Sequence, residues 1–276
     1  MSAVLIVAGK EFRDGMRNRW ALAITLVFAM LAVGLAYFGA AASGAVGFTS
    51  LATTVVSLSS LAVFLIPLIA LMLAYDSIVG EEEQGTLLLL MTYPLSRLQL
   101  LAGKFVGHGA ILAVSTALGF GVAGLVIVLF SDAAHPLDVI PAFGYFIVSA
   151  ILLGLVFVAF AFLISVLVGE KSRAAGLALV VWFLFVLVFD LALLGILVGT
   201  EGRVNAELFR YLLLFNPTDV FRLANLTGFE AAQAATGLAS IAAEHRFGAG
   251  FLLTVLVAWV AAPLALAGWL FSRRRA

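Results

Sequence analysis

The stretch that decides the fold is residues 20–75, WALAITLVFAMLAVGLAYFGAAASGAVGFTSLATTVVSLSSLAVFLIPLIALMLAY, which contains no charged side chain. As one helix rising about 1.5 Å per residue, it would be far longer than the hydrocarbon core of a bilayer, which is about 30 Å thick. The stretch must therefore cross a membrane twice. We place the turn in residues 39–50, because glycines there interrupt a helix and the hydroxyl side chains tolerate the membrane interface.

Four further stretches are long and apolar enough to cross. Residues 105–131, 139–169 and 247–272 contain no Asp, Glu, Lys or Arg, and residues 174–200 contain only Asp190. A crossing helix needs about 20 apolar residues. The sequence therefore predicts an all-α integral membrane protein forming a single domain over residues 1–276, whose six transmembrane helices lie at about residues 21–42, 51–75, 105–130, 140–168, 175–199 and 249–271.

The overall composition agrees with a lipid environment. Of the 276 residues, 64% are hydrophobic and 11% are charged, and the mean hydropathy is +1.20. A soluble domain has about 45–50% apolar and about 25% charged residues. The formal net charge is zero, so there is no basic excess to attract nucleic acid. The bulk partner that the composition predicts is the lipid bilayer.

The basic residues predict the orientation of the chain. An even number of spans puts both termini on one side, and cytoplasmic loops carry an excess of Lys and Arg. With the termini inside, eleven Lys and Arg lie on the cytoplasmic side and four lie outside. Residues 1–20 alternate apolar and charged positions, which is typical of an amphipathic helix on the membrane interface. We therefore expect cytoplasmic N- and C-termini in a multi-pass protein of the bacterial inner membrane.

Two connections between spans are long enough to carry a function. Residues 76–104 form a cytoplasmic loop, and residues 201–248 form an external segment with helical patterns at 206–215 and 230–245. Inside the external segment, Asn216 suits a helix N-cap, Pro217 the first helical position and Asp219 the third. We expect the external segment to be helical.

The motifs of common enzymes and metal sites are absent from the sequence. It has no G-x-x-x-x-G-K-[ST] phosphate loop, so we expect the chain not to hydrolyse ATP by itself. It has no cysteine, and its three histidines, at positions 108, 135 and 245, are dispersed. No group of ligands stands at metal-binding spacing. We therefore expect no metal site, no bound cofactor and no enzymatic activity in this chain.

A few polar and small residues inside the predicted spans need an explanation. Asp190 is the one acid well inside a span, and it is either a proton or cation site or a residue hydrogen-bonded to a neighbouring helix. Thr53 and Ser57 share one face of the second span, as a polar lining or as packing contacts. Gly195 and Gly199 form a G-x-x-x-G pair, a candidate dimer seam or a packing contact within one subunit.

The cytoplasmic loop contains a run of acids followed by a short apolar stretch. Residues 81–83 are all Glu, and residues 84–96 are uncharged but too short to cross a membrane. Such acids keep a loop solvated, or they form a specific docking edge for a basic partner. The apolar run after them reads as a short interfacial helix.

Residues 81–97, EEEQGTLLLLMTYPLSR, match an acidic motif that runs E-x-x-x-G-T-L and ends P-x-S-R. Together with the six spans and the amphipathic start, this stretch resembles the type-2 ABC transporter permease family. In that family the region contacts the ATPase subunit. The resemblance therefore implies an ABC type-2 permease fold, and it implies that the ATPase-coupling residues are Glu81, Glu82, Glu83, Gln84, Gly85, Thr86 and Arg97.

The resemblance also implies partners. Residues 10–14 (KEFRD) and 215–222 (FNPTDVFR) are similar to permeases that serve the maturation of the copper centres of periplasmic nitrous-oxide reductase. This similarity implies a homodimer, two copies of a separate ATPase that hold ATP and Mg, and a periplasmic β-helical copper-maturation protein. The residues that we expect to contact that periplasmic protein are Asn216, Pro217, Asp219 and Arg222.

Two other functions stay open on the residues alone. One is an ion-coupled secondary transporter that uses Asp190. The other is a non-transporting membrane scaffold for a periplasmic maturation complex. The cargo is equally open between copper, a sulfur species and none.

Overall fold

The computed structural model describes residues 2–17, 19–38, 51–130, 135–201, 203, 206–226 and 247–274. This part of the chain is helical, and it contains no β-strand. Its helices are α1 (Ala3–Arg17), α2 (Trp20–Phe38), α3 (Leu51–Ala74), α4 (Val79–Glu83), α5 (Thr86–Thr92), α6 (Arg97–Phe130), α7 (Pro136–Leu167), α8 (Lys171–Phe183), η2 (Leu184–Val188), α9 (Phe189–Gly199), α10 (Ala206–Leu212), η3 (Leu213–Phe215), α11 (Pro217–Leu226) and α13 (Ala249–Arg273).

The six predicted spans are confirmed. The segments long and apolar enough to cross a bilayer are Ala21–Phe38, Thr53–Glu83, Arg97–Phe130, Pro136–Leu167, Lys171–Gly199 and Ala249–Arg273. Helix α6 begins at Arg97, before the predicted third span at 105–130, and has 34 residues. At about 50 Å, such a helix extends beyond the hydrocarbon core. The first turns of α6 therefore belong to the predicted cytoplasmic connection at residues 76–104. The predicted turn at 39–50 and the predicted helix at 230–245 lie outside the described residues.

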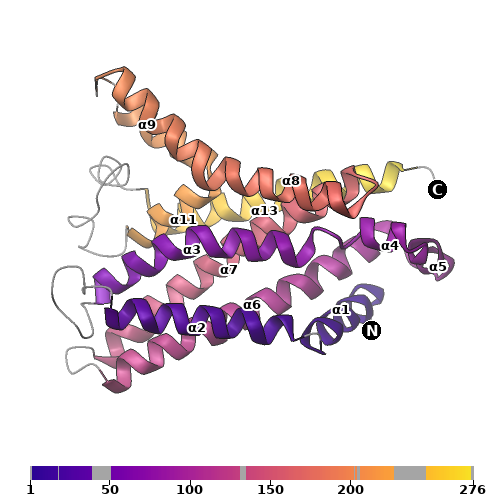
Figure 1. The fold of residues 1–276 in the computed structure, drawn as a ribbon, viewed down its shortest axis with the longest axis horizontal. Coiled ribbons are helices and arrows are strands. Elements are labelled where there is room, and N and C mark those ends of the chain that lie inside the picture. Colours follow the sequence, from indigo (N-terminus) through magenta and orange to yellow (C-terminus); the bar gives the residue numbers. More distant parts are fainter. Residues whose placement is uncertain are drawn as a thin grey trace.

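The long helices run roughly side by side along the longest axis of the molecule (Figure 1). Both termini lie at one end, together with α4 and α5. We call this the α4–α5 end. The outer ends of α3, α9 and α11 lie at the opposite end. Six crossings explain this arrangement, because an even number returns the chain to its starting side.

Helices α6 and α7 form the centre of the bundle. Helices α1 and α2 pack on α6, while α3 and α13 pack on α7. Aromatic rings connect the layers, with centroid distances of 5.0 Å for Phe28–Phe120, 4.9 Å for Phe120–Phe146 and 6.1 Å for Phe146–Phe221. These rings come from α2, α6, α7 and α11, so the external segment packs on the same core as the spans.

Glycines on α6 allow its neighbours to approach closely. A Cβ atom added at Gly103 would lie 2.6 Å from Val7 Cβ, and one at Gly107 would lie 2.6 Å from Glu11 Cβ. The G-x-x-x-G pair at 103 and 107 is therefore the surface on which α1 packs. The amphipathic first helix is thus fixed to the third span along one face, while Leu5 and Ile6 on its other face are exposed.

The fifth span contains an irregular segment. Helix α8 continues through the π-helix η2 into α9, which diverges from the bundle at the opposite end (Figure 1). The Trp182 indole of α8 donates to Phe64 O of α3 at 2.9 Å, so the first part of this span is held to the bundle. A Cβ atom at Gly195 or Gly199 would meet nothing within 4 Å. These glycines therefore pack on nothing within the described chain.

Candidate functional site

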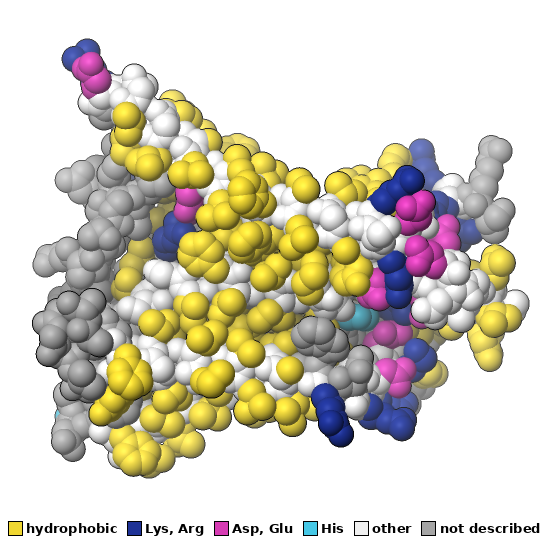
Figure 2. Space-filling view, viewed as in Figure 1, with side chains coloured by type: hydrophobic (Ala, Val, Ile, Leu, Met, Phe, Trp, Pro, Cys, Tyr) yellow, Lys and Arg dark blue, Asp and Glu magenta, His cyan; other side chains and the backbone are white. Residues whose placement is uncertain are grey.

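Charged side chains gather at the α4–α5 end (Figure 2). Helix α4 is held there by Ser165 of α7, whose hydroxyl accepts the N–H groups of Ile78 at 2.9 Å and Val79 at 3.0 Å. Those N–H groups precede or begin the helix and have no partner within it. Gly85 joins α4 to α5 at φ +70°, a conformation that favours glycine. One serine and one glycine therefore fix the position and the bend of this short segment.

The first glutamate of the acidic run belongs to a buried ion-pair chain. Lys104 Nζ lies 2.9 Å from both Glu81 Oε1 and Glu11 Oε1, and its side chain is only 4% exposed. Thr86 donates its hydroxyl to the Glu81 carboxylate. These residues come from α4, α6, α1 and α5. The ion pairs therefore connect the acidic run to α1 and α6. Gln84, between α4 and α5, is exposed.

The second and third glutamates also have partners within the chain. Glu82 pairs with Arg274, just beyond α13, and Glu83 Oε1 accepts the backbone N–H of Lys171 at 2.7 Å. Arg97 donates to the carbonyl oxygens of Phe271, at 3.2 Å, and Arg274. The acidic run is therefore not an unpaired edge in this structure. Its carboxylates hold α4 to α6, α8 and the end of α13.

Apolar side chains form the outermost part of this end. Leu88 is 67% exposed, and Leu89 and Tyr93 are each 64% exposed. Beside them is a recess of about 300 Å³. Its lining residues are Glu82, Gly85, Leu87, Leu88, Met91, Arg97, Phe271 and Arg274. An exposed apolar projection next to a recess with an acidic and basic rim is suited to binding another protein.

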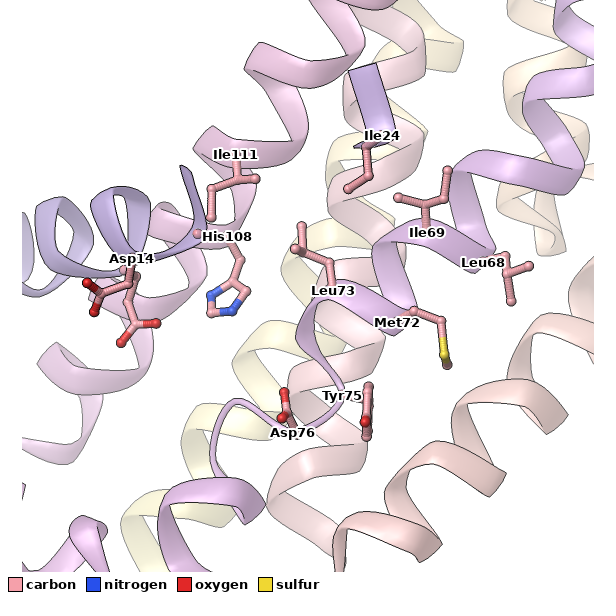
Figure 3. A pocket seen from close by; sticks show the side chains of 12 residues that line it. Asp14, Ile24, Leu68, Ile69, Met72, Leu73, Tyr75, Asp76, His108 and Ile111 are labelled. Carbon is pink, nitrogen blue, oxygen red and sulfur yellow. The ribbon is translucent and has the colours of Figure 1, made fainter. Parts of the chain in front are cut away.

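A larger cavity, of about 610 Å³, lies between α1, α2, α3 and α6. Figure 3 shows its polar residues, Asp14, Asp76 and His108, on one side and its aliphatic residues on the other. The polar groups already have partners. Asp14 pairs with Lys10 at 3.2 Å, and Asp76 pairs with Lys171 at 3.1 Å. His108 donates Nδ1–H to a carbonyl oxygen, and its Nε2 lies 3.4 Å from Ser77 Oγ.

The residues predicted to contact a periplasmic protein lie at the opposite end, and most of them are buried. Asn216 is confirmed as an N-cap, because its Oδ1 accepts the N–H of Thr218 at 3.1 Å. Asn216 Nδ2 also donates to Phe185 O at 2.9 Å, a carbonyl of the π-helix η2. Asn216 is 0% and Asp219 2% exposed, and Pro217 is buried as well. These three residues pack α11 against the spans, and a partner contact through them stays a prediction.

Asp190 has an internal counterion. Its Oδ2 lies 3.3 Å from Arg222 Nη1, and Arg222 also pairs with Asp219 at 2.8 Å. Thr53 and Ser57, on α3, take no part in this ion pair. The structure thus joins Asp190, through Arg222, to Asp219, so two residues predicted for the partner contact lie beside Asp190. In the described part of the chain, no group of three or more His, Cys, Asp or Glu could hold a metal ion.

Comparisons with known proteins agree with this architecture. The model of the ABC-2 family transporter proteins matches residues 5–276. The chain belongs to the ABC-2 transporter family. It is also 57% identical, over 274 residues, to a protein named "Probable ABC transporter permease protein NosY" from Stutzerimonas stutzeri, and equally to a protein of that name from Pseudomonas aeruginosa. The alignments cover 99% of this chain and 99% of each relative.

Family membership assigns the chain to the permease subunits of ABC transporters, which are multi-pass proteins of the bacterial inner membrane. Sequence reasoning missed several residues of the α4–α5 end in this permease. The sequence predicts only the membrane orientation from Lys104, Lys171 and Arg274. It predicts no role for Ser165.

Proposed function

We propose that this permease couples ATP binding and hydrolysis by a separate ATPase subunit to motion across the inner membrane. We further propose that it serves the assembly of the copper centres of periplasmic nitrous-oxide reductase. The observation that carries the proposal is the 57% identity, across 99% of the chain, with two proteins named as NosY permeases. ATP and Mg are held by the partner ATPase and not by this chain.

The α4–α5 end is the proposed ATPase contact. The excess of Lys and Arg at this end supports a cytoplasmic location. The exposed Leu88, Leu89 and Tyr93 meet the ATPase, and the acidic run transmits the displacement. Since Glu81 binds α6 and α1 through Lys104, while Glu82 and Glu83 bind the ends of α13 and α8, a shift of α4 moves four other helices.

The assembled transporter is a homodimer with two ATPase copies. The exposed face of α9, with Gly195 and Gly199, supports a dimer seam there, because small residues let helices approach closely in lipid. The periplasmic β-helical partner rests on the external segment. The contact supported by exposure is α10 and η3, where Leu208 is 57%, Tyr211 50% and Phe215 66% exposed.

The test is a pair of substitutions on α5. Leu88→Asp with Leu89→Asp places two charges on the proposed contact without altering any ion pair of the acidic run. Burying a charge without a partner in an interface is costly, so we expect co-purification of the ATPase to fall at least about tenfold. ATP hydrolysis coupled to the permease should fall with it. Leu137→Asp, on an 87% exposed leucine at the opposite end, is the control.

The alternatives give different results. If an inactive ATPase leaves the copper content of the reductase intact, the chain is a scaffold. If a proton or sodium gradient drives flux without any ATPase and Asp190→Asn abolishes it, the chain is a secondary transporter. The ion pair with Arg222 gives Asp190 a counterion within the chain, which argues against a site that binds a free metal cation.

A further inference from the structure

Two carboxylates and one guanidinium meet where α9 and α11 come together. Arg222 Nη1 donates to Asp219 Oδ1 at 2.8 Å and to Asp190 Oδ2 at 3.3 Å, and Nη2 donates to Asp190 Oδ2 at 3.3 Å. A single cation therefore serves both acids. Asp190 belongs to the fifth span, whereas Asp219 and Arg222 belong to the external segment. We call these three residues the α9–α11 cluster.

The cluster is largely removed from solvent. The side chain of Asp219 is 3% exposed, that of Asp190 27% and that of Arg222 22%. Val220 and Phe221, beside Asp219 on α11, are fully buried in the core. A charge without a partner is costly in such surroundings, so a buried cluster tends toward neutrality.

No further cation contacts the cluster in the part of the chain that the structure describes. Helix α11 packs on α3, α7, η2, η3 and α13. The titratable residues of those elements are Asp138 and Tyr145 on α7 and Arg273 at the far end of α13. Those of α10, which adjoins η3, are Glu207, Arg210 and Tyr211, and Arg210 lies over the rings of Tyr211 and Phe247. With both carboxylates ionised and Arg222 as their one cation among the described residues, this part of the chain carries one negative charge in excess at the cluster.

Two details show how that charge can be neutralised. Asp190 Oδ1 is buried and has no hydrogen-bond partner among the described residues, so it is a free acceptor next to a second carboxyl group. Asp219 lies outside the six spanning segments, and burial together with the negative charge of Asp190 raises its pKa to about 7 against the opposing effect of Arg222.

We propose that Asp190 and Asp219 bind one proton between them, so that the α9–α11 contact is a proton-binding site of the permease. With the proton, one carboxylate remains and Arg222 balances it. Without the proton, the two carboxylates repel each other across the contact, and α9 is held less firmly to α11. Arg222 Nη1 contacts both carboxylates, so a proton on the cluster relieves the repulsion between them. The proposal does not depend on the ATPase or on copper maturation.

The test is infrared spectroscopy of the purified transporter in lipid nanodiscs, titrated from pH 5 to 9. The signal is the C=O stretch of a protonated carboxyl group, taken as the difference between wild type and each variant. We expect a difference band for Asp219→Asn that titrates near pH 7. Asp190→Asn should also give a difference band, because removing the negative charge of Asp190 lowers the pKa of Asp219, although burial still raises it.

Glu201→Gln is the matched control, since Glu201 is an acid on the same side of the molecule whose side chain is 74% exposed. Its difference spectrum should show no band near pH 7. The proposal is overturned if neither aspartate variant gives a titrating band, or if only Asp219→Asn gives one. Size-exclusion profiles establish that the variants are folded, and Asp190→Asn retains the test if Asp219→Asn does not fold.

Discussion

Lys104 is the residue on which the α4–α5 end depends most. Its ammonium group is buried between Glu11 and Glu81, whose side chains are 13% and 21% exposed. Removing one partner of a buried ion pair leaves uncompensated charge and typically costs about 3–5 kcal/mol. We therefore expect Lys104→Met to lower the thermal unfolding temperature of the detergent-purified permease and to weaken coupling to the ATPase.

Lys10→Met is the control for this prediction. Lys10 also pairs with Glu11, but its side chain is 58% exposed. An exposed pair contributes about 1 kcal/mol or less, so the unfolding temperature should change little. If both variants unfold at the same temperature as the wild type, the buried ion-pair chain does not hold this end together.

Asp219 predicts a pH dependence of stability with a definite sign. Its pKa in the folded protein is raised to about 7, mainly by burial, whereas the ordinary value is 3.8. The folded state then keeps a proton that the unfolded state has lost, so stability falls as pH rises between these two values and is constant above them. We expect wild type to lose stability relative to Asp219→Asn from pH 5 to 7.5. A constant difference between their unfolding temperatures would contradict this sign.

At the scale of helices, close packing on α6 depends on single glycines. A Cβ atom at Gly119 would lie 2.5 Å from Phe28 Cβ, whereas one at Gly121 would meet nothing within 4 Å. We expect Gly119→Ala to force α2 away from α6 at a cost of about 1–3 kcal/mol. Gly121→Ala should be neutral or stabilising by up to about 1 kcal/mol, because alanine is the better helix former. Heating followed by size-exclusion chromatography distinguishes the two, and equal effects would contradict the packing.

The helices were predictable from the sequence wherever apolar length alone decides them. Uncharged stretches of 20 or more residues identify spans, because lipid leaves a chain no other way to satisfy its backbone. The start of α6 was missed, since charged Arg97 and Lys104 look like loop residues until their partners are known. The N-cap at Asn216 was found because its signal is local, but its burial against η2 depends on tertiary packing.

At the scale of the whole molecule, the location of the candidate site was predictable and the roles of its residues were not. The acidic motif marks residues 81–97. Its carboxylates bind Lys104, the backbone N–H of Lys171 and Arg274, which lie 23, 88 and 192 residues further along the chain than their partners. Similarly, residues 215–222 stood out as a motif, but their burial follows from α11 packing into the bundle. Long-range pairing of this kind is decided by the assembled fold and leaves no periodicity in the sequence.

Orientation in the membrane can be tested directly, because the chain has no cysteine. We expect Leu137→Cys, at the opposite end, to react with a membrane-impermeant maleimide in spheroplasts. Arg173→Cys, on a side chain that is 70% exposed near the α4–α5 end, should react only after the inner membrane is opened. The reverse pattern would contradict cytoplasmic termini.

The central claim is that ATP binding by an ATPase docked on the α4–α5 end moves the opposite end of a permease dimer. The most direct measurement is the distance between spin labels at Glu201→Cys in the two protomers of the purified transporter, with and without trapped ATP. We predict that ATP shifts the distance distribution, and that Leu88→Asp with Leu89→Asp abolishes the shift. An identical distribution with and without ATP, while the ATPase is bound, would contradict the account.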